Sequence, residues 1–176
     1  AEGGVADAQT ALGGYYNFGR EGVGIDLPRA RTWYAKAAAQ GHANAQNNLG
    51  TMYRDGRGGP QDFTRARELF ELAAAQGNAA AQCSLGIMHH DGQGEPQDFT
   101  RARELYELAA AQGDAMAQYN LGFMLRDGQG GPQDFTRARE LYEMAAAQGH
   151  ANAQFNLVHM YHNGEGGPQD FTRGRE

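Results

Sequence analysis

The chain has 176 residues, and its 15 Lys and Arg against 21 Asp and Glu give a formal net charge of −6. Only one lysine, Lys36, is present, and no basic patch exists, so the composition argues against nucleic acid and anionic lipid as partners. The single cysteine, Cys83, precludes an intrachain disulfide. The sequence contains no apolar run of about 18 residues, so insertion into a membrane is not predicted.

A 36-residue period organises the chain. The stretch Gly131–Gly149 is G-P-Q-D-F-T-R-A-R-E-L-Y-E-M-A-A-A-Q-G; it recurs almost unchanged at 59–77 and 95–113 and begins again at 167. A looser version, Asp26–Gly41, opens the series. Periods of 20–50 residues are typical of solenoids. The sequence therefore predicts a single repeat domain over 1–176, with units near 5–41, 42–77, 78–113, 114–149 and a truncated 150–176.

Each unit is predicted to hold two helices, A and B, joined by a glycine-rich turn. In the second unit, helix A covers 42–54, and the turn 55–61 contains Gly and Pro residues that do not continue a helix. Asp62 is expected to cap helix B, which ends at Gly77. Helix A is predicted near 5–16, 42–54, 78–90, 114–126 and 150–162, and helix B is predicted four times complete and once as a stub at 170–176.

The apolar residues of helix B follow the spacing of one buried helix face. In the second unit they are Ala66, Leu69, Phe70, Ala73 and Ala74. The alanines allow neighbouring helices to approach closely. One such hairpin could not bury enough surface alone, so the units are expected to stack.

The constant positions resemble the Sel-one-like repeat, a relative of the tetratricopeptide repeat. The residues that carry the resemblance include Ala45-Gln46, Leu49-Gly50, Met52-Tyr53, Ala66 and Gly77, with their counterparts in later units. The resemblance implies an all-α fold: a right-handed α/α superhelical solenoid of antiparallel helix pairs with the A helices on the concave side. It also implies a scaffold or adaptor that holds proteins, peptides or occasionally glycans.

Helix A differs between units at four positions, 44/80/116/152, 47/83/119/155, 51/87/123/159 and 54/90/126/162. At about 100° per residue these fall on one face, within an arc of roughly 80°. Free drift of exposed positions would favour polar replacements, yet Met116, Tyr119, Phe123 and Phe155 appear there. Rows of exposed apolar and aromatic residues mark interaction surfaces, so we interpret this stripe as a binding groove.

The sequence thus predicts a non-catalytic module that binds a protein or peptide on the concave face of its A helices. Arg54 and Arg126 are expected to anchor a partner carboxylate. The predicted binding residues are Arg54, Ile87, His90, Met116, Tyr119, Phe123, Arg126, Asn152, Phe155, His159 and His162.

No cofactor or metal is predicted. His159 and His162 have the i, i+3 spacing of some metal ligands, but no Cys or carboxylate completes a shell nearby in the sequence. The glycine turns lack the Lys-Ser/Thr of a phosphate loop and the alternating oxygen ligands of an EF-hand. Cys83 has no base nearby in the sequence and is interpreted as a small groove residue.

Several alternatives stay open on the sequence alone. A hydrolase could use Cys83 or the histidines, a spacer could hold other domains of a longer chain apart, and near-identical copies could reflect design or recent duplication. The chain begins and ends inside a unit, which indicates an excised fragment of unassigned compartment. Its last helix B stops before the Leu-Tyr-Glu-Leu half, so an open apolar end is expected to favour end-to-end self-association.

Overall fold

The computed structural model describes residues 3–20, 22 and 24–172, and every regular element within these ranges is an α-helix, as predicted. The chain forms two compact units, each larger than one 36-residue repeat: from here on the first unit is residues 1–85 and the second unit is residues 86–176. The division falls within the fifth helix. None of the described helices combines the length and apolar character that crossing a membrane requires. The helices are α1 (Gly3–Phe18), α2 (Leu27–Ala39), α3 (Ala43–Arg54), α4 (Phe63–Ala75), α5 (Ala79–Asp91), α6 (Phe99–Ala111), α7 (Ala115–Asp127), α8 (Phe135–Ala147) and α9 (Ala151–Asn163).

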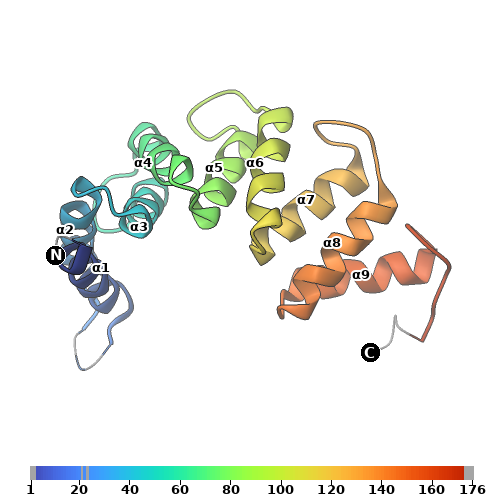
Figure 1. The fold of residues 1–176 in the computed structure, drawn as a ribbon, viewed down its shortest axis with the longest axis horizontal. Coiled ribbons are helices and arrows are strands. Elements are labelled where there is room, and N and C mark those ends of the chain that lie inside the picture. Colours follow the sequence, from blue (N-terminus) through green and yellow to red (C-terminus); the bar gives the residue numbers. More distant parts are fainter. Residues whose placement is uncertain (1–2, 21, 23, 173–176) are drawn as a thin grey trace. The chain divides into compact units, whose positions relative to one another are not determined.

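Odd-numbered helices are the predicted A helices and even-numbered ones the B helices. In the first unit α3 packs on α4, and in the second α7 packs on α8, which form the yellow-to-orange hairpin in Figure 1. Small residues bring the paired helices together. A β-carbon added at Gly50 of α3 would lie only 2.8 Å from the ring of Phe70 on α4. The glycine at this position of helix A, which is Val158 in the last repeat, therefore allows this close approach.

The buried face of helix B agrees with its predicted pattern. Ala66, Phe70 and Ala73 of α4 are fully buried, while Leu69 and Ala74 are half-buried. The equivalent aromatic residues, Tyr106 on α6 and Tyr142 on α8, are buried as well.

The ends of the helices follow local hydrogen bonding. Asp62 caps α4 as predicted, and its side chain accepts a bond from the Arg65 amide at 3.0 Å. The predicted helix at 42–54 begins one residue later, because His42 is itself the cap: its Nδ1 accepts from the Ala45 amide at 3.2 Å. The stub predicted at 170–176 lies mostly outside the described residues; 171–172 form a turn.

The constant glutamine of helix A joins consecutive helices. Gln118 of α7 is buried; its Nε2 donates to the Ala110 carbonyl at 3.4 Å, and its Oε1 accepts from Gln148 Nε2 at 2.8 Å. Gln46 repeats both bonds in the first unit, with Ala38 and Gln76 as its partners. A buried amide requires such partners, which explains the glutamine of the Ala-Gln motif.

Candidate functional site

A cleft of about 310 Å³ lies over α5, α6 and α7 in the second unit. Five of the predicted binding residues line it, from α5 and α7: Ile87, His90, Met116, Tyr119 and Phe123. Three further residues complete the lining: Asp91, Tyr106 and Asn120. The cleft therefore brings together side chains that the sequence places on one face of successive A helices.

Neighbouring groups hold the rings of the cleft in place. Tyr119 stacks on the imidazole of His150, with ring centroids 4.6 Å apart. Phe123 meets the ring of His90 edge-on at 6.5 Å, and the Arg126 guanidinium carbon lies 5.1 Å from the centroid of Phe123. Met116 is 47% exposed, which leaves an adaptable apolar side chain at the mouth of the cleft.

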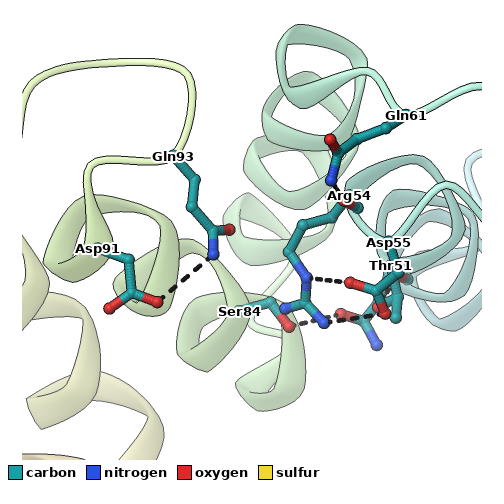
Figure 2. Close-up of polar contacts among 8 residues, drawn as sticks. Thr51, Arg54, Asp55, Gln61, Ser84, Asp91 and Gln93 are labelled. Carbon is teal, nitrogen blue, oxygen red and sulfur yellow. Dashed lines mark hydrogen bonds and ion pairs between the residues drawn. The ribbon is translucent and has the colours of Figure 1, made fainter.

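A carboxylate stands at the rim of the cleft. His90 Nδ1 donates to Asp91 Oδ1 at 2.7 Å, and His90 Nε2 lies 3.2 Å from Gln129 Oε1. Gln93 Nε2 donates to the other oxygen of Asp91 at 3.4 Å, the contact drawn on the left of Figure 2. The Asp91 side chain is still 46% exposed, so the carboxylate is open to a partner.

The two predicted arginine anchors already have carboxylate partners in this chain. Arg54 Nε donates to Asp55 Oδ1 at 2.7 Å in the first unit (Figure 2). Arg126 Nε donates to Asp127 Oδ1 at 2.8 Å in the second unit, and this bond raises the pKa of Arg126. A partner carboxylate would have to compete with these aspartates for either arginine.

The predicted residues of α9 lie apart from the cleft. Phe155 is 65% exposed and contacts the ring of His159 edge-on at 4.6 Å. His162 contacts the ring of Phe171 edge-on at 5.1 Å, and Asn152 is exposed. His159 instead shares a more polar cleft of about 610 Å³ with Arg126, Asp127, Gln133, Phe135, Met160, Asn163 and Glu165.

The interpretation of Cys83 as a groove residue is wrong. Cys83 is 4% exposed, although it occupies the position of Tyr119 and Phe155. Its side chain is much smaller than theirs, so neighbouring groups can close over it. In the described part of the chain, no three His, Cys, Asp or Glu side chains gather as a metal site would require.

Sequence reasoning missed Asp91, Tyr106 and Asn120. Tyr106 is the counterpart of Phe70 on the predicted buried face of helix B; it is buried, yet it also lines the cleft. Asp91 repeats the aspartate that begins the turn after helix A, as Asp55 does, and Asn120 belongs to a mostly constant position. Nothing in their variation between units could have marked them.

The family model described as the Sel1 repeat matches residues 6–42, 43–78, 79–114, 115–150 and 151–176. Each match begins one residue after the unit boundary predicted from the sequence. No curated protein matches the chain.

Solved structures match over nearly the whole chain. A protective antigen of uropathogenic Escherichia coli with an SLR fold is 38% identical over 99% of this chain, with a TM-score of 0.87, and the match covers 37% of that protein. A Sel1 repeat protein from Oxalobacter formigenes is 34% identical over 97% of this chain and 67% of its own, with a TM-score of 0.85. A Sel1 repeat protein assigned in Klebsiella pneumoniae is 26% identical over 98% of this chain and 84% of its own, with a TM-score of 0.68. These matches confirm the predicted all-α solenoid of helix pairs.

Proposed function

Because this chain belongs to the Sel1 repeat family, whose members are generally non-catalytic protein-interaction modules, we propose that it binds a protein or peptide on the face of its A helices. The cleft over α5, α6 and α7 is the centre of that contact. The observation that carries the proposal is that five predicted residues, from two A helices, line this one cleft.

The composition of the cleft suits a peptide side chain. Its volume is at the lower end of the range for small-molecule sites, about 300–1,000 Å³, and so suits one large side chain rather than a whole cofactor. Phe123 and Tyr119 offer rigid aromatic surface that loses little entropy on binding, while Asn120 and His90 offer polar groups for the peptide backbone. No accessible thiol supports the hydrolase alternative, since Cys83 is buried.

Peptides selected from a displayed library against the intact chain test this proposal. We expect Met116→Ala and Phe123→Ala each to lower the affinity for the selected peptides by about tenfold or more, as truncation of a binding hot spot does. Met144→Ala is the matched control, because Met144 on α8 is 45% exposed and lies outside this cleft. Affinity is measured by fluorescence anisotropy, with circular dichroism to confirm that each variant is folded. Equal affinity for Met116→Ala, Phe123→Ala and the parent chain would refute the cleft as the binding site. If the selection yields no peptide that binds the chain, the result would favour the alternative that the chain is a spacer between domains.

We further propose that α9 supports association with a second copy of the chain. Phe155 is exposed, whereas Cys83 at the same position of α5 is buried. Gln154 is exposed, whereas Gln118 at the same position of α7 is buried. A large exposed aromatic side chain is typical of an interaction surface.

Sedimentation velocity over a range of concentrations measures this association. The chain is expected to dimerise as its concentration rises, and Phe155→Glu is expected to stay monomeric. Leu108→Glu, an exposed residue of α6, should dimerise like the parent chain. A parent chain that is monomeric throughout, or a Phe155→Glu variant that still dimerises, would count against the proposal.

A further inference from the structure

We infer that the segment bound in the cleft is basic, and that an arginine or lysine side chain lies against the aromatic rings and pairs with Asp91. This inference rests on the proposed function, since it specifies the partner of the same cleft. Three observations support it: the distribution of charge along the chain, the pairing of the arginines, and the lining of the cleft.

The net charge of the protein resides in its second unit. Residues 86–176 contain thirteen acidic and seven basic residues, whereas residues 1–85 contain eight of each. The second unit therefore carries the whole formal charge of −6, and the first is balanced. An asymmetric charge of this kind attracts partners of the opposite sign and accelerates their association.

The arginines of the second unit are already paired. Each of the five within its described residues has a carboxylate oxygen within 4 Å, from a side chain one to four positions away. The pairs are Arg101–Glu104, Arg103–Glu107, Arg126–Asp127, Arg137–Glu140 and Arg139–Glu143. An acidic partner would have to displace one of these carboxylates.

The lining of the cleft favours a cation directly. It contains no Lys or Arg, and its one carboxylate, Asp91, is held by His90 and Gln93 rather than by an arginine. Tyr119 and Phe123 provide ring faces that attract a guanidinium or an ammonium group. An acidic side chain in the cleft would lie near the carboxylate of Asp91, and this repulsion disfavours it.

Methionine methyl groups report on the cleft separately from the rest of the chain. The six methionines, labelled with ¹³C at their methyl groups, include Met116 in the cleft and the similarly exposed Met144 outside it. The probes are two short apolar peptides that are identical except that arginines in one are glutamates in the other. We expect the arginine peptide to shift the Met116 signal but not that of Met144, and the glutamate peptide to shift neither. Added salt should weaken the binding.

Charge-removing variants test the role of Asp91. Asp91→Asn is expected to lower the affinity for the arginine peptide about two- to fivefold, the range for an exposed ion pair. Glu140→Gln removes the same charge from α8, outside the cleft, and should leave the affinity nearly unchanged.

The outcomes separate this inference from the proposed function. If both peptides shift Met116 equally, or if Asp91→Asn has no effect while Phe123→Ala abolishes binding, the basic partner is refuted and the cleft remains a peptide site. If neither peptide shifts Met116, the inference also fails, and the library selection decides the proposed function independently.

Discussion

Alanine in place of Gly130 is expected to destabilise the second unit by about 2–5 kcal/mol. Gly130 has a φ of +69°, which costs a residue with a β-carbon about 1–2 kcal/mol. Its β-carbon would also collide with the backbone carbonyl oxygen of Phe99, at the start of α6. Backbone cannot rotate away as a side chain can, so the collision adds a further overpacking cost of about 1–3 kcal/mol.

Gly113 is the matched control for this substitution. Its φ is +89°, and an added β-carbon would meet nothing within 4 Å. Gly113→Ala should therefore cost only the conformational part, about 1–2 kcal/mol. Urea unfolding followed by circular dichroism measures both variants. Equal losses in the two variants would mean that the turn does not pack against the preceding B helix as closely as the structure shows.

Loss of stability at high pH is expected to depend on Tyr142. Its ring is fully buried, and burial raises the pKa of Tyr142 to about 12, although Arg126 and Asn156 favour the ionised form. The pKa in the folded chain therefore lies above the ordinary value of 10. The stabilisation that this shift represents is fully present below pH 10 and is lost as the pH rises towards 12. Two pKa units correspond to about 2–3 kcal/mol.

Tyr142→Phe should remove this pH dependence without harm at neutral pH. Phe70 fills the same position in α4, fully buried, and the Tyr142 hydroxyl makes no well-formed hydrogen bond among the described residues. Near pH 7 the free energy of unfolding of the variant is expected to lie within about 1 kcal/mol of that of the parent chain. Above pH 10 the parent should lose more stability than the variant, by up to about 2–3 kcal/mol. Burial also raises the pKa of Tyr34, but that effect is common to both chains. Parallel stability curves between pH 8 and 12 would contradict the prediction.

Much of the cleft could be predicted because the chain supplies its own comparison. Packing keeps Leu85 and Met88 of α5 buried, so equivalent positions hardly vary, while the open face is free to change. That contrast pointed to Ile87 and Phe123, which do line the cleft. It could not point to Asp91, because turn geometry keeps an aspartate there in most units regardless of what it faces.

The repeat by itself determined the fold. Glycine, proline and capping aspartate mark where helices begin and end, and the apolar spacing marks which face is buried; these are local properties that recur every 36 residues. Only the tertiary structure decided which side chains a partner can reach. Cys83, Tyr119 and Phe155 share one helical position, yet they are buried, half-buried and exposed. Accessibility depends on side-chain size and on contacts between helices distant in the sequence, and a helical period specifies neither.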